Sequence, residues 1–386
     1  MQEAFAQHAR RDSLLSELEQ HDVIDFGAKL LKIGDKGKID RKKKVGTLLF
    51  SVIPIAPAES GEGKVAISAI NASFYLSHES NLSSIYFYPY TNFKGSYGVT
   101  LTPNIWLEKN AWNLTGDFRL IQNVLRDYGL GSSAPKDQIG LVEYGQVRTY
   151  LTGYIKIKNY FYVGTGYNLD YFYDTRQASV DAPTSTRDNF NNYDKQPVNI
   201  TSSGVTVNLL RDNRKNSVNP RGGLYANFNF RINQRDLAST TSWTSIYAEA
   251  RKYFSFSETR HKILAFRSLY WGTYGDVPYL NMPATFQDVN GRAGRGYSTN
   301  RFRGRSMAFF EAEYRFDISQ TGFLGGTFFA NMQSFAQSSG SLEAPAPAAG
   351  FGLRLKFNRN SDTNIAIDFG VGRDGLGVSV NLGEYF

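Results

Sequence analysis

The chain has 386 residues, no cysteine, 15% aromatic residues and a mean hydropathy of −0.38. It lacks any run of about 20 apolar residues, which excludes a helical membrane protein, and without cysteine it has neither disulfides nor thiolate metal sites. The formal net charge of +8 is spread along the chain. It therefore suits contact with anionic lipid or lipopolysaccharide head groups and argues against nucleic acid as a partner.

Residues 1–46 differ in character from the rest. A short helix is predicted by apolar residues at roughly helical spacing, namely Leu14, Leu15, Leu18, Phe26, Leu30 and Leu31. A basic run from Lys36 to Lys44 follows. No secretory signal follows Met1, so we expect a mature or re-engineered N-terminus. The helix and basic linker form either a solvated periplasmic segment, which the modest amphipathicity favours, or a segment that rests on lipid phosphates or enters a barrel mouth.

From residue 45 onward, apolar and polar residues alternate over strand-length segments. Leu224, Ala226, Phe228, Phe230 and Ile232 share one face, opposite Tyr225, Asn227, Asn229, Arg231 and Asn233. A soluble sandwich explains one such strand, but the pattern recurs along most of the chain. Charges at successive inward positions, as in Glu311, Glu313 and Arg315, are costly in a dry core but stay solvated in a wide lumen. The sequence therefore predicts an all-β transmembrane barrel.

About sixteen strands are expected, an even number that places both chain ends on the periplasmic side. We expect an N-terminal segment over 1–46 and a barrel over 47–386. The first strand runs from Thr47 to Ile55 and the last from Leu376 to Phe386. The others centre near Ile70, Tyr86, Leu101, Phe118, Thr149, Tyr162, Val205, Phe228, Tyr247, Phe266, Glu311, Phe329, Leu353 and Ile367. Longer polar stretches at 126–138, 175–198, 276–304 and 337–346 predict extracellular loops.

The stretch from Val277 to Arg305 contains five arginines among glycines and aromatic residues. Arginines in this number are too costly for lipid, and their planar groups make paired hydrogen bonds to carboxylates. Acidic residues on the inward faces of strands are natural partners. By strand parity these are Glu311, Glu313 and Asp368.

At this loop the sequence resembles a known family. Arg295, Gly296 and Tyr297 match the Arg-Gly-Tyr/Phe signature of the BamA/TamA/FhaC (outer-membrane-protein-85) superfamily of assembly and secretion barrels of Gram-negative bacteria, which includes bacterial surface antigen type barrels. Further segments match in the same order: 211–213 with 220–223, 311–316 and 367–370. The resemblance covers about residues 45–386. It implies sixteen strands, a signature loop folded back into the barrel, and an arginine paired with an acidic wall residue.

Two departures from the family pattern matter. Asn331 stands where members commonly carry an aspartate, so Asp368 becomes the preferred partner of Arg295. The polypeptide-transport-associated (POTRA) repeats that usually precede such barrels have no room in residues 1–46. The chain thus resembles short, barrel-only members.

The resemblance leaves two functions open. In the first, the barrel acts in outer-membrane biogenesis or transport, alone or as a subunit of an envelope complex, and a protein or lipid client passes a seam between the first and last strands. Its partners would be outer-membrane lipid, lipopolysaccharide, envelope proteins or nascent barrels, and the seam is expected at Leu49, Val378, Val380 and Phe386. In the second, the barrel is a scaffold or passive pore plugged by its own loop.

Catalysis and metal binding have little support. Ser77, His78 and Glu79 bring together the residue types of a lipase, but neighbours in sequence do not make a triad. We therefore expect no enzyme activity and no cofactor. Metal-ligand spacing is lacking, although the Asp/Asn-rich loop 181–195 offers oxygen ligands for weak calcium binding.

Overall fold

The computed structural model describes most of the chain from residue 45 onward. The described residues are 22–23, 45–60, 63–93, 95–137, 139–180, 197–257, 262–289, 291–338 and 341–386, with backbone alone for 54–60, 63–65 and 178–180. The predicted N-terminal helix lies almost wholly outside these ranges. Within them no helix is both long and apolar enough to cross a membrane.

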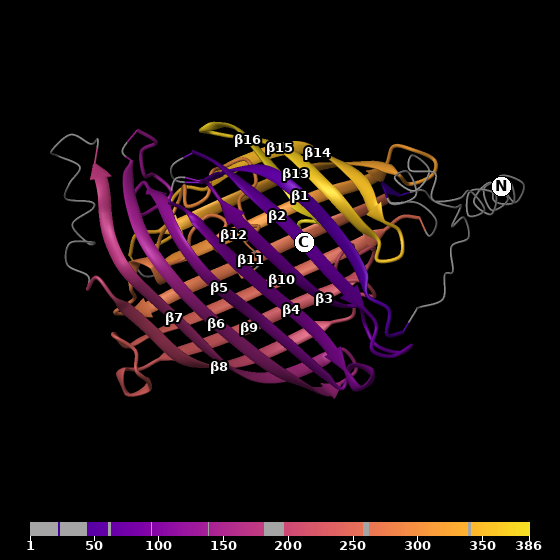
Figure 1. Ribbon diagram of the computed structural model, residues 1–386, viewed down its shortest axis with the longest axis horizontal. Coiled ribbons are helices and arrows are strands. Elements are labelled where there is room, and N and C mark those ends of the chain that lie inside the picture. Colours follow the sequence, from indigo (N-terminus) through magenta and orange to yellow (C-terminus); the bar gives the residue numbers. More distant parts are fainter. Residues whose placement is uncertain are drawn as a thin grey trace, which may run out of the picture.

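The described chain forms a single sheet of sixteen antiparallel strands whose order follows the sequence. The sheet curls into a nearly closed barrel with tilted strands (Figure 1). This confirms the predicted fold class. The strands are β1 (Leu49–Ser60), β2 (Gly63–Phe74), β3 (Ser83–Thr91), β4 (Tyr97–Leu107), β5 (Trp112–Asp127), β6 (Gly140–Lys158), β7 (Phe161–Val180), β8 (Ile200–Asp212), β9 (Gly223–Asn233), β10 (Trp243–Ser255), β11 (Lys262–Gly275), β12 (Ser306–Asp317), β13 (Leu324–Ala336), β14 (Ala346–Asn358), β15 (Thr363–Gly372) and β16 (Gly375–Leu382).

The two faces of the sheet have opposite chemistry. On the outer face, the side chains of Phe310, Phe328 and Phe351 are 41%, 59% and 50% exposed. Glu311 and Glu313, which share β12 with Phe310, are buried on the inner face. Rings from neighbouring strands also pair on the outer face: Phe316 and Phe328 lie 5.5 Å apart. An apolar outer face of this kind stabilises a barrel only in a bilayer, where it meets hydrocarbon instead of water.

Loop length differs between the two ends of the barrel. The connection 213–222 leaves the end where β1 starts and β16 ends. The three longest connections, 128–139, 181–199 and 276–305, leave the opposite end, as does 337–345. These ranges agree with the predicted long loops, except that β7 continues to residue 180 and β14 begins at 346. The two strands extend further than predicted because each continues its pairing with a neighbour, β7 with β6 and β14 with β13.

The last predicted strand is shorter than expected. It ends at Leu382, and Gly383, with φ of +89°, turns the chain away from the sheet. Residues 383–386, here called the tail, enter the lumen, so the chain end lies within the barrel outline (Figure 1). Phe386 is 2% exposed. Phe386, which the sequence analysis placed in the last strand and at the seam, lies in the lumen instead, because buried polar and aromatic contacts hold the tail inside.

Candidate functional site: the filled lumen and the β1–β16 seam

The connection between β11 and β12, residues 276–305, folds into the lumen; we call it the motif loop. It is bonded to widely separated walls. Tyr279 donates to Asp127 of β5 (2.7 Å), and Asn281 donates to Asp170 of β7 (3.0 Å). Other bonds reach β11, β13 and the β15–β16 turn, through Arg267–Asp288, Thr285–Gln333 and Arg301–Asp374. The motif loop therefore spans the barrel.

Arg295 of the motif loop has a fully buried side chain. Its guanidinium lies between two rings: Cζ is 3.8 Å from the ring centroid of Phe329 in β13 and 4.4 Å from that of Tyr385 in the tail. Cation–π contacts gain strength when desolvated in this way. Its Nη atoms face the carboxylates of Glu311, Glu313 and Asp368.

The structure thus brings Arg295 close to all three acids that parity selected. Asp368, the preferred partner in the sequence analysis, lies 3.3 Å from Nη1, while Nη2 donates hydrogen bonds to Glu311 and Glu313. Asp368 is also bound by Arg354 of β14, whose Nη1 donates a hydrogen bond to it at 2.8 Å. Asn331, at the place of the family aspartate, donates through Nδ2 to the carbonyl of Arg295 (3.0 Å). It holds the loop backbone and leaves the cation to the acids.

Gly296 and Tyr297 dock the motif loop on the last strands. Gly296 has φ of +93°, and a Cβ there would lie 2.8 Å from Cβ of Ala348. A side chain at this position would therefore clash as well as strain the backbone. The Tyr297 ring lies over Gly372 of β15, and its hydroxyl donates to the carbonyl of Pro347 (2.6 Å). The signature thus contacts β14 and β15 beside the seam.

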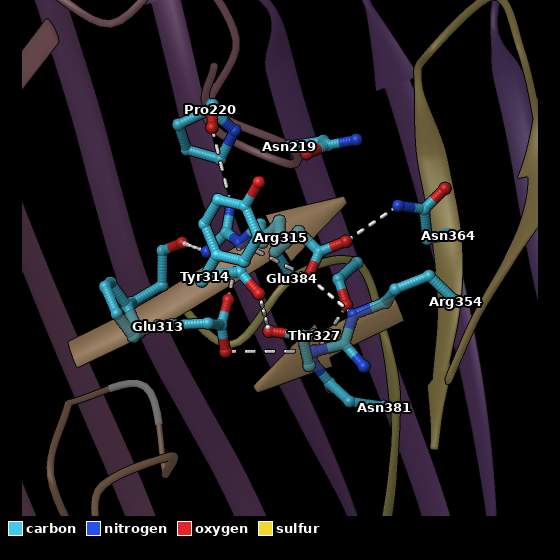
Figure 2. Close-up of polar contacts among 12 residues, drawn as sticks. Asn219, Pro220, Glu313, Tyr314, Arg315, Thr327, Arg354, Asn364, Asn381 and Glu384 are labelled. Atoms are coloured by element: carbon cyan, nitrogen blue, oxygen red, sulfur yellow. Dashed lines mark hydrogen bonds and ion pairs between the residues drawn. The ribbon is translucent and has the colours of Figure 1, made fainter. Parts of the chain in front are cut away.

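Two further arginines and one acid complete a buried ionic network, the lumen cluster; Figure 2 shows four of its members, Glu313, Arg315, Arg354 and Glu384. Arg315 Nε donates to Glu313 (2.5 Å), and Arg354 Nε donates to Glu384 of the tail (2.7 Å). Arg354 and Glu384 were not singled out from the sequence. The sequence shows the charge of both residues and the alternation around Arg354. The two side chains come together only because the chain turns at Gly383. The cluster comprises Arg295, Arg315, Arg354, Glu311, Glu313, Asp368 and Glu384.

The tail crosses the lumen. Burial by itself would raise the pKa of Glu384, but Arg354 and Arg315 offset it and hold this pKa below its ordinary value. Burial and nearby Asp368 raise the pKa of Tyr385 to about 12, so its hydroxyl stays protonated. The Phe386 oxygen accepts a bond from Arg315 (2.7 Å), and its ring lies 6.2 Å from that of Tyr253. The tail therefore links β16 to the far wall at β10 and β12.

The turn between β8 and β9, residues 213–222, reaches across the barrel end where β1 starts; we call it the strap. Asn216 donates to the carbonyl of Ser361 (3.0 Å), and Asn219 donates to that of Asp362 (3.2 Å), both in the β14–β15 turn. The carbonyl of Val218 accepts the Glu384 N–H (3.1 Å). The strap therefore fastens the middle of the chain to its last strands and tail.

The seam between β1 and β16 has an unusual construction. In the described residues no backbone ladder joins these strands, so the sheet is open there. Ile53 of β1, Ala69 of β2 and Leu382 of β16 form one buried apolar cluster, against which Val380 packs. Ile53 and Ala69 face the lumen, whereas Val378 on the parity of Leu382 faces outward and is 56% exposed. The end of β16 therefore lies on the inner side of β1, and Asn358 of β14 bonds the Phe50 carbonyl beyond it (3.2 Å).

The remaining sequence candidates lie apart from the lumen cluster. Ser77 and Ser80 bond each other in the turn between β2 and β3. The loop 181–195 lies outside the described residues. Among the residues that are described, no group of three or more His, Cys, Asp or Glu side chains is placed to hold a metal ion.

An apolar outer belt, sixteen strands and a lumen filled by the chain's own loop and tail define a bacterial outer-membrane β-barrel. The chain belongs to the Omp85 superfamily, because the model of the Omp85 superfamily domain matches residues 77–372. This confirms the resemblance drawn from the Arg-Gly-Tyr signature. The family comprises insertion and transport barrels that are not enzymes.

Comparison with one solved structure, BamA, agrees with this fold. The chain is similar to BamA from Haemophilus ducreyi lacking POTRA domains 1–3, with TM-score 0.51 and 13% identity over 96% of this chain and 80% of that one. It is also matched to CdiB from Acinetobacter baumannii, with TM-score 0.49 and 12% identity over 87% of this chain and 60% of that one. No curated protein sequence matches the chain.

Proposed function

We propose that this protein acts in outer-membrane biogenesis by inserting or translocating a protein or lipid client at the seam between β1 and β16. The seam is the observation that carries the proposal. It has a strand edge without a ladder and is held by an apolar overlap instead of backbone hydrogen bonds. Such an edge can pair with an incoming strand. Membership of the Omp85 superfamily supports the same role.

The filled lumen favours the seam over the barrel axis as the route. A client that passed along the axis would have to break the buried ion pairs of Arg267, Arg295 and Arg301. Each of these pairs joins the motif loop to a strand or turn of the barrel. The same contacts favour a second candidate, a scaffold or passive pore plugged by the Arg-Gly-Tyr loop. The two candidates differ in whether the seam must open.

The proposal includes an orientation. Both described ends of the barrel chain would lie on the periplasmic side, with residues 1–46 as a periplasmic segment, because the three longest loops leave the opposite end. Asp22 accepts a bond from the Arg359 N–H (2.9 Å) in the β14–β15 turn, which supports that side for the N-terminal segment. The partners would be outer-membrane lipid, lipopolysaccharide, envelope proteins and nascent barrels.

A reversible tether tests the proposed function. Ile53→Cys with Leu382→Cys should lock the overlap, whereas Ala312→Cys with Ala330→Cys joins strands that are already paired in register. Each pair replaces the wild-type protein in its native host, and outer-membrane protein content and lipid asymmetry are measured. A defect confined to the oxidised seam pair and reversed by reductant supports the proposal. Normal assembly with a fully formed seam disulfide contradicts it, and steady ion conductance of that tethered protein would favour the pore.

A further inference from the structure

The outer wall from β8 to β13 carries a groove of about 740 Å³, a volume typical of ligand pockets. Much of the outer belt consists of large apolar side chains, but the groove floor consists of small ones. The floor residues are Ala226, Ala248, Ala250, Ser268 and Ala308. Phe228, Phe310 and Met332 stand along it as ridges.

Strand register shows how the groove runs. Arg211 pairs with Ala226, Ala226 with Ala250, and Ala250 with Ser268, so these residues form a row across four strands. Barrel strands are tilted by about 35–45° from the membrane normal, and a row perpendicular to them therefore climbs through the bilayer. The groove starts at Arg211, near the barrel end where β1 begins, and rises toward Pro345 at the opposite end.

The starting point of the groove is cationic. The Arg211 side chain is exposed, points outward and makes no hydrogen bond or ion pair in the described structure. Lys252 of β10, beside the groove lining, also faces outward and is exposed, and its Nζ lies 5.3 Å from the ring centroid of Phe254. It lies two strands away and two residues beyond Ala250 in the row, which sets the two Cα atoms about 12 Å apart. Two long cationic side chains at this spacing can both reach one phosphate.

We propose that this groove is a binding site for a glycerophospholipid of the leaflet on the side of the chain ends. One acyl chain lies on the small-residue floor between the aromatic ridges, where it gains close packing contacts. The phosphate accepts charge-assisted hydrogen bonds from Arg211 and Lys252. The site lies on the β8–β13 wall, away from the seam, and does not depend on the seam carrying a client.

A second copy of the chain fits this surface less well. Two copies related by a two-fold axis along the membrane normal would present the same patch to each other, with both Arg211 side chains at equal depth. These like charges would repel, and a convex barrel wall cannot fill a concave groove. An acyl chain with an anionic head group complements both the shape and the charge.

Native mass spectrometry of the full chain, purified in mild detergent and titrated with palmitoyl-oleoyl phosphatidylglycerol, tests the proposal. Arg211→Gln with Lys252→Gln should weaken retention of one lipid about tenfold, as expected for the loss of charge-assisted bonds. Lys262→Gln removes an outward cation at the same barrel end outside the groove and should leave retention unchanged. Ala248→Phe should fill the floor and weaken retention, whereas Ala330→Phe, on an exposed site outside the groove, should not.

Several results would overturn the lipid site. These are equal retention by all variants, equal retention of a diacylglycerol without phosphate, preferential retention of lipid A over phosphatidylglycerol, or a dimer in place of a lipid adduct. The groove and the seam cluster share no residues, so the groove substitutions leave the seam residues in place and the seam cysteines leave the groove in place. A failure of the lipid site is therefore distinguishable from a failure of the proposed function.

Discussion

Replacing Arg295 by alanine should destabilise the barrel by about 3 kcal/mol. Removing one partner of a buried ion pair costs about 3–5 kcal/mol, because a charge is left without compensation. Glu313 keeps Arg315, and Asp368 keeps Arg354, but Glu311 loses the one cation that it contacts in the described structure. We therefore expect the lower end of that range. Loss of the contacts with Phe329 and Tyr385 adds to it.

Urea unfolding in lipid vesicles, followed by the gel mobility difference between folded and unfolded barrel, measures this cost. Arg295→Ala combined with Glu311→Gln should recover part of it, since the unpaired carboxylate is then neutral. Arg176→Ala is the control: its side chain is 73% exposed and pairs with Glu143, so its loss should cost less than about 1 kcal/mol. A free energy of unfolding for Arg295→Ala equal to that of Arg176→Ala would refute the argument that Arg295 compensates buried acids.

Three further predictions concern the loop, the tail and the seam. Gly296→Ala should loosen the motif loop at a cost of about 2 kcal/mol and expose it to protease, whereas Gly322→Ala, also at positive φ but with open space around it, pays the backbone strain alone. Equal protease sensitivity would contradict the docking. Because the folded pKa of Glu384 is lowered, its contribution to the free energy of unfolding is present above the ordinary pKa near 4.3 and is lost as pH falls through the folded pKa. Glu384→Gln should remove this part of the pH dependence of unfolding. An unchanged pH profile would contradict the prediction. Ile53→Cys with Leu382→Cys should crosslink faster, as followed on a gel, than Leu49→Cys with Val380→Cys. Ile53 lies beside Leu382, the last residue of β16, and β1 runs antiparallel to β16, so Leu49 lies beyond the end of β16. Faster crosslinking of the second pair would reject the overlap.

Alternation alone predicted most of the fold. Strands such as β9 and β12 are read correctly because lipid on one side and a polar lumen on the other impose a period of two. The predicted centre at Tyr162 lies close to the start of β7, since pairing with β6 and β8 extends that strand. Phe386 has the same even parity as Leu382, but alternation does not reveal the turn at Gly383 between the two residues.

The site was predictable in part for the same reason. Parity placed Glu311, Glu313 and Asp368 inside, and the density of arginine in the loop indicated cations to meet them. How the arginines and acids pair depends on distances that residue spacing does not encode. Arg354 donates a hydrogen bond to Asp368, and the Arg295 guanidinium lies over the Tyr385 ring. The strap contacts were equally invisible, because they join turns far apart in the sequence.

The strap has a consequence for the order of folding. Its bonds to the β14–β15 turn join residues separated by 143 and 145 positions in the sequence. The bond between Val218 and Glu384 joins residues that are still further apart in the sequence. Contacts of such long range form late, after the entropy of closing the chain between them has been lost. β8 and β9 can pair as a local hairpin, but their turn waits for the last strands. We expect circularisation of this barrel to be timed by the strap meeting the β14–β15 turn and the tail, with β1 and β16 meeting as a result.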